Sequence, residues 1–347
     1  MLRSVQFFFF LSLLIFINGC VGASTQPFLW QDETVDLVWP DSPDKPRIRY
    51  LRSLTGSLDF KEKNQTAGFL NWLLGEHQED LPLLGPFAVA VSRPGSVWVA
   101  DNGARALYQL DLVSRKISFF KEFAGTRLVS PSGIALDDER QRIFLADAGH
   151  RQIFVLDFEG NYLDSWGPEK GFERPAGLAL DSTGRLLVAD AMGGVVYVFN
   201  LDGTIASQIS SKVNPDGRFL RPLSVAVGPR DEVLILDAMS FRVEVQDAQG
   251  ELLGTIGQVG DAAGSMARPK GLAVDKEGHV FVSDSAFDNI QVFDMAGKLL
   301  MYWGKSGTQP GQFNLPAGLF VDQQGRLFAA DSYDHRIQVF QLLSDVY

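Results

Sequence analysis

Six aspartates recur along the chain at nearly equal intervals, each near the end of a short apolar run. Successive aspartates are separated by 46, 43, 47, 47 and 47 residues. A period of this length, repeated six times, restricts the chain to folds built from six similar units. The aspartates of the repeat are Asp101, Asp147, Asp190, Asp237, Asp284 and Asp331.

The sequence of each unit predicts four short β-strands. In the last unit, residues 318–321 and 326–330 form the first two strands, with Gly325 in the turn between them, and residues 336–340 form the third. A fourth strand is visible in other units, for example at 298–304. Short β-rich runs at even spacing with glycine turns indicate repeated antiparallel sheets. We therefore predict an all-β fold, a six-bladed β-propeller of four-stranded blades.

Two segments carry a resemblance to a known family. The connector Gly304-Lys305-Ser306-Gly307-Thr308-Gln309-Pro310-Gly311-Gln312-Phe313-Asn314-Leu315-Pro316 and the strand pair 280–284 and 289–294 resemble NHL repeats. The resemblance extends over roughly residues 84–341 in six registered copies. It implies a six-bladed propeller that binds a protein partner, as many NHL-repeat proteins do.

A propeller has to close its ring, because an unpaired sheet edge invites aggregation. The sixth unit stops after its third strand, since only residues 342–347 follow Gln341. Residues 47–54 form a strand-like run that precedes Gly56, as other fourth strands precede a glycine. We predict that this run supplies the missing strand, so that the propeller spans residues 47–341 and is followed by a short tail.

An insertion, residues 57–83, separates the closing strand from the first blade. Phe69, Trp72 and Leu73 follow the i, i+3, i+4 pattern of a short amphipathic helix within residues 66–79. We favour a helix that caps the rim of the propeller. An exposed apolar contact for a partner or a membrane is the alternative.

The N-terminus has the pattern of an exported lipoprotein. Arg3 precedes an apolar run that is too short for a comfortable membrane span but suits a signal peptide. The sequence Ile17-Asn18-Gly19-Cys20 resembles the lipobox of bacterial lipoproteins. This resemblance implies that residues 1–19 are removed and that Cys20, the one cysteine of the chain, is acylated. Cleavage of an ordinary signal peptide after Ala23 is the alternative.

Two further features extend this interpretation. Val21 follows Cys20, which by resemblance to enterobacterial sorting rules points to the outer membrane. Residues 20–46 have prolines at three of their last eight positions, so we expect an extended, lipid-attached tether. The lone cysteine excludes an intramolecular disulfide, and packing must hold the exported domain together.

The charge of the chain narrows its partners. The net charge is −11, from 31 lysines and arginines against 42 aspartates and glutamates. A negative field repels phosphate backbones, so nucleic acid is a poor candidate. We expect a monomeric domain that contacts a protein of the cell envelope and, through its lipid, the membrane.

We interpret the repeated aspartates as structural, because a catalytic site uses unlike residues from different blades. A carboxylate at a strand end can accept hydrogen bonds from loop amides and pair with an arginine across the turn. The predicted pairs are Asp101 with Arg105, Asp147 with Arg151, Asp237 with Arg242, and Asp331 with Arg336.

A metal-dependent lactonase- or lyase-like enzyme is the alternative function. Related six-bladed lyases hold a metal with several histidines, and no such set is evident among the four histidines of this chain. Lactonase-like relatives use carboxylate and asparagine ligands at the mouth of the channel, which the sequence leaves open. No catalytic triad, nucleotide-binding loop or haem-attachment motif is present. We predict no catalytic residue, metal ligand or cofactor, and a single divalent metal in the channel under the alternative.

One face of the propeller carries the candidate binding residues. Arginines precede the first-strand prolines of blades 3, 4 and 5, so we expect them to cluster at the channel mouth, where they attract an anion or an acidic partner or stay solvated. Apolar residues follow the repeated aspartates on the same face, as an interaction patch or as parts of blade interfaces. The sequence thus predicts a membrane-tethered binding scaffold. The candidate residues are Arg174, Arg221, Arg268, Met192, Met239, Phe241, Phe287 and Tyr333.

Overall fold

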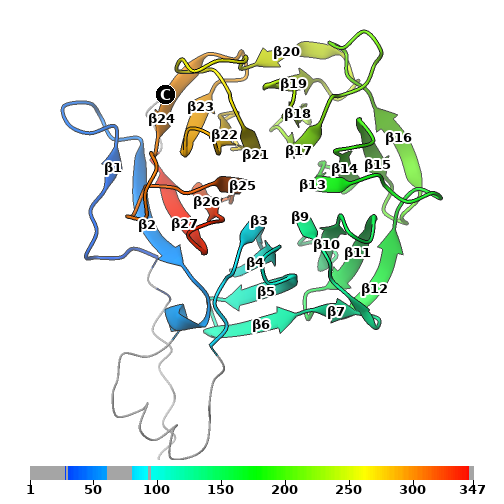
Figure 1. The fold of residues 1–347 in the computed structure, drawn as a ribbon, viewed down its shortest axis with the longest axis horizontal. Coiled ribbons are helices and arrows are strands. Elements are labelled where there is room, and N and C mark those ends of the chain that lie inside the picture. Colours follow the sequence, from blue (N-terminus) through cyan, green and yellow to red (C-terminus); the bar gives the residue numbers. More distant parts are fainter. Residues whose placement is uncertain (1–27, 29, 61–79, 93–94, 344–347) are drawn as a thin grey trace, which may run out of the picture.

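The computed structural model describes residues 28, 30–60, 80–92 and 95–343. In this part of the chain, six sheets stand in a ring around a central channel, and each sheet forms one blade (Figure 1). The all-β, six-bladed propeller predicted from the sequence is confirmed. Within the described residues, no helix is both long and apolar enough to cross a membrane.

The strands of each blade are antiparallel. The first strand lies beside the channel and the fourth lies on the outer rim (Figure 1). Blade 1 contains β3 (Pro86–Val91), β4 (Ser96–Asp101), β5 (Ala106–Asp111) and β6 (Lys116–Phe120). A small hairpin follows, formed by β7 (Glu122–Phe123) and β8 (Thr126–Arg127). Blade 2 contains β9 (Pro131–Asp137), β10 (Arg142–Asp147), β11 (Gln152–Asp157) and β12 (Tyr162–Trp166). Blade 3 contains β13 (Pro175–Leu180), β14 (Leu186–Asp190), β15 (Val195–Phe199) and β16 (Ile205–Ile209).

The second half of the ring repeats this order. Blade 4 contains β17 (Pro222–Val227), β18 (Val233–Asp237), β19 (Arg242–Gln246) and β20 (Leu252–Ile256). Blade 5 contains β21 (Pro269–Val274), β22 (Val280–Asp284), β23 (Asn289–Phe293) and β24 (Leu299–Trp303). Blade 6 contains β25 (Pro316–Val321), β26 (Arg326–Asp331) and β27 (Arg336–Leu342), to which the N-terminal strand β2 (Ile48–Leu54) is added.

The N-terminal strand closes the ring as the sequence predicts. β2 pairs antiparallel with β27, with Ile48 opposite Leu342 and Leu54 opposite Ile337. β1 (Val38–Trp39) pairs with the outer edge of β2 as a fifth strand. Both ends of the propeller therefore belong to one sheet, and β27 has no open edge.

Burial explains why the strands differ in composition. The second strand of a blade is buried along almost its whole length, as β14 shows, because neighbouring blades cover both faces. Fourth strands lie on the rim, and β16 is exposed over most of its residues. Large aromatic side chains fill the wedge-shaped spaces between blades, and the ring centroids of Phe144 and Trp166 lie 5.0 Å apart. The core is thus a set of clusters between blades.

The segment from residue 30 to residue 46 differs from the extended tether that we expected. Trp30 makes an edge-to-face contact with Phe328 at 5.8 Å, and the guanidinium of Arg326 lies 3.7 Å from the centroid of its ring. Trp39 contacts Phe340 at 5.9 Å. Burial of these aromatic rings outweighs the extended bias of the prolines, which do not obstruct a two-residue edge strand. The segment is therefore docked on blade 6.

The insertion leaves and re-enters the propeller at one point. Residues 57–60 form a short 3₁₀-helix, η1 (Ser57–Phe60), and the amide of Ser57 donates to the carbonyl of Leu81 at 3.1 Å. Gly56 and Pro82 form an antiparallel bridge. The helix predicted within residues 66–79 and the end of the C-terminal tail lie outside the described residues.

Candidate functional site

Every repeated aspartate is buried and fastens the loop that leads into the first strand of its blade. Asp190, for example, accepts hydrogen bonds from the amides of Glu173 and Arg174 at 2.8 and 2.7 Å, and from the amide of Gly193 at 3.0 Å. Equivalent connector amides bind the other five carboxylates. A carboxylate whose oxygens are occupied by backbone amides is a structural fastener of the blade.

Of the four predicted aspartate–arginine pairs, the described residues contain one ion pair. Arg336 Nε lies 2.8 Å from Asp331 Oδ2. The structure does not bring the other three pairs together, and loop amides bind those carboxylates. Instead, Arg105 lies in the turn with a φ of 51°, Arg151 pairs with Glu173 at 3.1 Å, and Arg242 donates to Asn214 Oδ1 at 2.8 Å.

Regular aspartate–arginine pairs form at the opposite face of the ring instead. There the end of a first strand carries a mostly buried carboxylate, and an arginine at or near the start of the second strand pairs with it. These pairs neutralise the acidic residues at that end of the channel. They are Asp137 with Arg142 at 3.1 Å, Asp181 with Arg185 at 2.6 Å, and Asp322 with Arg326 at 2.6 Å.

The aspartate fasteners also position three of the candidate arginines. The amides of Arg174, Arg221 and Arg268 donate to the aspartates of blades 3, 4 and 5 at 2.7, 2.7 and 3.0 Å. Each arginine immediately precedes the proline that starts the first strand. The same bond at three neighbouring blades thus places three guanidinium groups on one side of the channel mouth. We call this end of the ring the connector face, because the loops between blades lie there.

A cavity of about 550 Å³ opens at this mouth, and all three arginines line it. Lys270, Phe87 and Leu223 also line the cavity. Burial and the positive charge of the three arginines lower the pKa of Lys270. Its Nζ lies 6.0 Å from the centroid of the Phe87 ring. We call this space the mouth cavity.

Sequence reasoning missed Lys270, although the repeat contains a signal for it. The residue after the first-strand proline is uncharged in the other five blades, where it is phenylalanine, serine, alanine or leucine. Blade 5 alone has a charged residue there. A cation at a position that faces the channel is therefore a departure from the repeat, and such departures mark a site.

The four cations of the mouth cavity have no carboxylate partner within the part of the chain that the structure describes. The Nε atom of Arg221 is buried and has no hydrogen-bond acceptor among those residues. Concentrated, uncompensated positive charge on a chain of net charge −11 is costly unless an anion binds it. The mouth cavity therefore has the electrostatics of an anion site.

The candidate apolar residues divide into three groups. Met239 and Phe241 line the mouth cavity beside the arginines. Met192 and Tyr333 are 63% and 65% exposed on the same face. Phe287 is half-buried. The predicted patch is thus brought together in part, at blade 4.

Comparison with known proteins agrees with this fold. Residues 313–340 match the family model of the NHL repeat. The chain carries an NHL repeat within a six-bladed β-propeller. No curated protein matches it in sequence.

Solved structures resemble this NHL-type propeller at low sequence identity. Virginiamycin B lyase from Staphylococcus aureus has 13% identity and a TM-score of 0.57, over 75% of this chain and 96% of that one. An auxiliary nutrient binding protein from Bacteroides thetaiotaomicron has 13% identity and a TM-score of 0.58, over 75% and 70%. Hydrazine synthase from Kuenenia stuttgartiensis has 12% identity and a TM-score of 0.54, over 78% and 99%. Likeness at this identity shows the fold alone.

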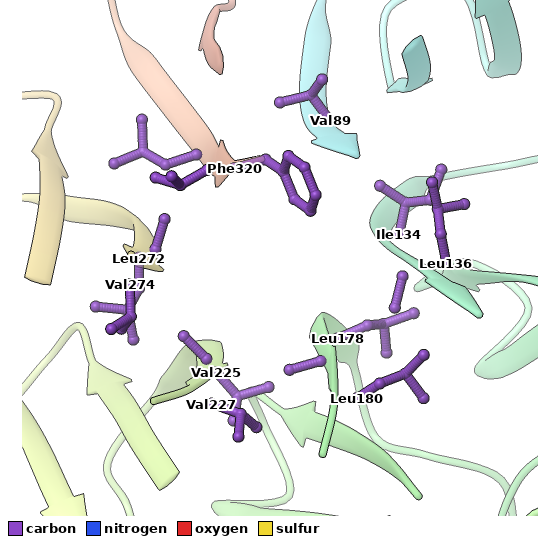
Figure 2. A pocket seen from close by; sticks show the side chains of 16 residues that line it. Val89, Ile134, Leu136, Leu178, Leu180, Val225, Val227, Leu272, Val274 and Phe320 are labelled. Carbon is purple, nitrogen blue, oxygen red and sulfur yellow. The ribbon is translucent and has the colours of Figure 1, made fainter. Parts of the chain in front are cut away.

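The side chains that line the channel of the propeller beneath the mouth cavity are hydrocarbon. A hollow of about 290 Å³ lies there, lined by residues from the first strands of all six blades. Figure 2 shows their side chains arranged around it. Its lining is made of valine, leucine, isoleucine and alanine, with Phe320 as the one aromatic residue. These hydrocarbon side chains offer no metal ligand, general acid or general base. The lining of this hollow therefore does not fit the channel metal that the enzyme alternative requires.

Among the described residues, one group has the spacing of metal ligands, and it lies in the turn between β21 and β22. It consists of Asp275, Glu277 and His279. Asp275 Oδ1 accepts the amides of the other two residues, and its Oδ2 lies 2.7 Å from His279 Nδ1. These hydrogen bonds stabilise the turn, which accounts for the closeness of the three residues without a metal.

Proposed function

We propose that the protein is an exported, lipid-anchored binding scaffold whose connector face binds an acidic protein partner in the cell envelope. The observation that carries this proposal is the mouth cavity, where four cations gather without a carboxylate partner among the described residues. An acidic segment would supply the missing charge, and arginine can bind a carboxylate through two parallel hydrogen bonds.

The surface around the cavity supports a protein ligand. Arg174 and Arg268 are exposed, so a partner can reach them without rearranging the fold. Met192, Met239 and Tyr333 add exposed apolar side chains on the loops of the same face. Buried apolar anchors within a charged surround are the usual anatomy of a protein interface.

The anchor would set the distance between propeller and membrane. Phe28 already packs against Trp30 and Phe60, with ring centroids 5.4 and 6.2 Å away. If Cys20 is acylated, the chain from Cys20 to Phe28 spans at most roughly 29 Å even when fully extended. The propeller would then be held with blade 6 close to the outer membrane.

Site-specific photo-crosslinking in the native cell envelope tests the proposal. A photoreactive residue at Met239 should capture a discrete protein, and one at Glu159, in a turn of the opposite face, should not. Changing Arg174, Arg221 and Arg268 together to glutamate should abolish the Met239 product, because the cavity would then repel an acidic ligand. Equal products from Met239 and Glu159, or a product that survives the triple change, would refute the proposal.

A further inference from the structure

We propose that the mouth cavity and the apolar channel beneath it form one binding site for a small amphipathic acid, an anionic headgroup with a single linear alkyl chain. The headgroup contacts Lys270 and Arg221, and the alkyl chain enters the channel. This site does not require the protein partner proposed above.

The mouth cavity and the channel are lined by successive residues of the same first strands. The mouth-cavity residue of each strand lies in a β-bulge, and beyond the bulge side chains two positions apart point to the same face, at a spacing of about 7 Å. On β21, Lys270 lines the mouth cavity, whereas Leu272 and Val274 line the channel. The same order occurs on the neighbouring strands. Leu223 is followed by Val225 and Val227, Phe87 by Val89, and Ser132 by Ile134 and Leu136.

The two ends of the channel differ in charge. The four cations of the mouth cavity make no ion pair with the described residues, and the pKa of Lys270 is lowered by burial and by its arginine neighbours. At the opposite end, Asp181 and Asp322 lie at the ends of first strands, each paired with an arginine at 2.6 Å. An anionic headgroup is therefore attracted to the mouth cavity, whereas the arginines beside Asp181 and Asp322 at the far end are already paired.

The side chains that line the channel suit an alkyl chain, because all of them are hydrocarbon. An alkyl chain has no polar group to desolvate. The space of about 290 Å³ corresponds to on the order of ten water-sized groups, so a chain of about ten carbons fits.

Calorimetric titration with a series of alkyl acids tests the inference. The protein is the mature chain, residues 20–347, with Cys20→Ser so that no lipid or detergent competes. Hexanoate, octanoate and decanoate, kept below their micelle concentrations, should bind about fourfold more tightly for each added methylene. The gain should stop near ten carbons, so that dodecanoate binds no better than decanoate. Decanol, which lacks the charge, should bind at least tenfold more weakly than decanoate.

Three variants separate the headgroup from the chain. Lys270→Met should weaken hexanoate and decanoate alike, by tenfold or more. Val227→Phe narrows the deeper part of the channel and should weaken decanoate while leaving hexanoate unchanged. Lys298→Met removes an exposed cation of the opposite face and should change neither. If Val227→Phe does not fold, the chain-length series on the otherwise unaltered protein still decides.

The outcomes are distinct from those of the crosslinking experiment. Equal affinity for hexanoate and decanoate would show a headgroup site without a channel site and would overturn the inference, as would equal binding of decanol and decanoate. A crosslinked partner together with no acid binding would overturn this inference and leave the proposed function standing. Acid binding without a crosslinked partner would do the reverse.

Discussion

The amide of Arg221 donates a hydrogen bond of 2.7 Å to Asp237 Oδ1, so the buried carboxylate that fastens blade 4 also holds a cation of the mouth cavity. The same carboxylate accepts the amide of Leu220 at 2.8 Å. One carboxylate therefore both fastens the blade and positions this arginine. The repeated aspartate can place a different side chain at the channel mouth in each blade, because the residue whose amide it binds differs between blades.

The dual role of Asp237 can be tested against an aspartate that has only the structural one. Asp237→Ala leaves two connector amides without their acceptor and should lower the free energy of unfolding by about 3 kcal/mol. Asp147→Ala should cost a similar amount, because Asp147 also holds two connector amides, but it positions Ser130 where blade 4 has Arg221. Urea unfolding measures both losses.

Only Asp237→Ala should also weaken binding of decanoate to the folded protein, because only it releases a cation of the mouth cavity. Calorimetric titration at a temperature where both variants are folded gives the comparison. Equal weakening by both variants would show that the aspartates affect binding through general loosening of the ring.

Lys270 is predicted to reduce stability at neutral pH. Its pKa is lowered by burial and by repulsion from three arginines, so the unfolded chain binds more protons than the folded chain between that pKa and about 10.4. The free energy of unfolding of the wild type should therefore rise with pH through this window. Lys270→Met should be the more stable protein at pH 7, by up to about 1 kcal/mol after allowance for solvent screening.

Urea unfolding at pH 7, 8, 9 and 10 tests whether the free energy of unfolding of the wild type rises with pH. The advantage of Lys270→Met over the wild type should shrink as the pH rises toward 10. Lys298→Met provides the control for loss of an exposed lysine. A constant advantage at every pH would contradict the assigned repulsion and would point to packing of the methionine side chain.

The ring could be predicted from the sequence because its signals are local and repeated. Strand periodicity, the first-strand prolines and the aspartate spacing each occur in several copies, and ring closure follows from the need to cover β27. The docking of residues 30–46 could not be predicted in this way. It depends on contacts such as Trp30 with Phe328, which are nearly 300 residues apart and occur once.

The candidate site was likewise predictable from the sequence only in part. The sequence placed Arg174, Arg221 and Arg268 together because they share a position in the repeat, and the structure brings them to one cavity. Arginine pairing was predicted for the wrong turn, because an aspartate followed by an arginine four residues later occurs at both ends of a blade. Asp101 with Arg105 and Asp181 with Arg185 have the same spacing. Arg105 has a φ of 51° in its turn and makes no ion pair with Asp101, whereas Arg185 directly precedes β14 and pairs with Asp181.

Metal content distinguishes the scaffold from the enzyme alternative. Because the described channel lining offers hydrocarbon side chains, elemental analysis of the purified mature protein should find no stoichiometric metal. A chelator should leave the melting temperature unchanged. A bound metal whose removal lowers the melting temperature would favour the metal-dependent enzyme and would direct activity assays to lactones and peptidyl amides.

Acylation of Cys20 predicts how the protein is retained in the cell. A clickable fatty acid fed to the native cells should label the wild type and not Cys20→Ser. The variant should leave the outer-membrane fraction, because it lacks the acyl chains that would hold it there. Melting of the purified variant should match the wild type, because Cys20 lies outside the described residues that form the propeller. Persistent membrane association of Cys20→Ser would show that another contact provides the anchor.

Two truncations separate the docked segment from the closing strand. A chain that begins at residue 47 loses the contacts of Trp30 and Trp39 with blade 6 and should unfold at lower urea concentration, with a loss of about 2 kcal/mol. It should keep one cooperative transition, because β2 still pairs with β27. A chain that begins at residue 55 also loses β2 and exposes the edge of β27, so it should aggregate or unfold without cooperativity. Circular dichroism and size-exclusion chromatography distinguish the two results. Cooperative unfolding of both truncated chains at the same urea concentration would show that β2 does not close the ring.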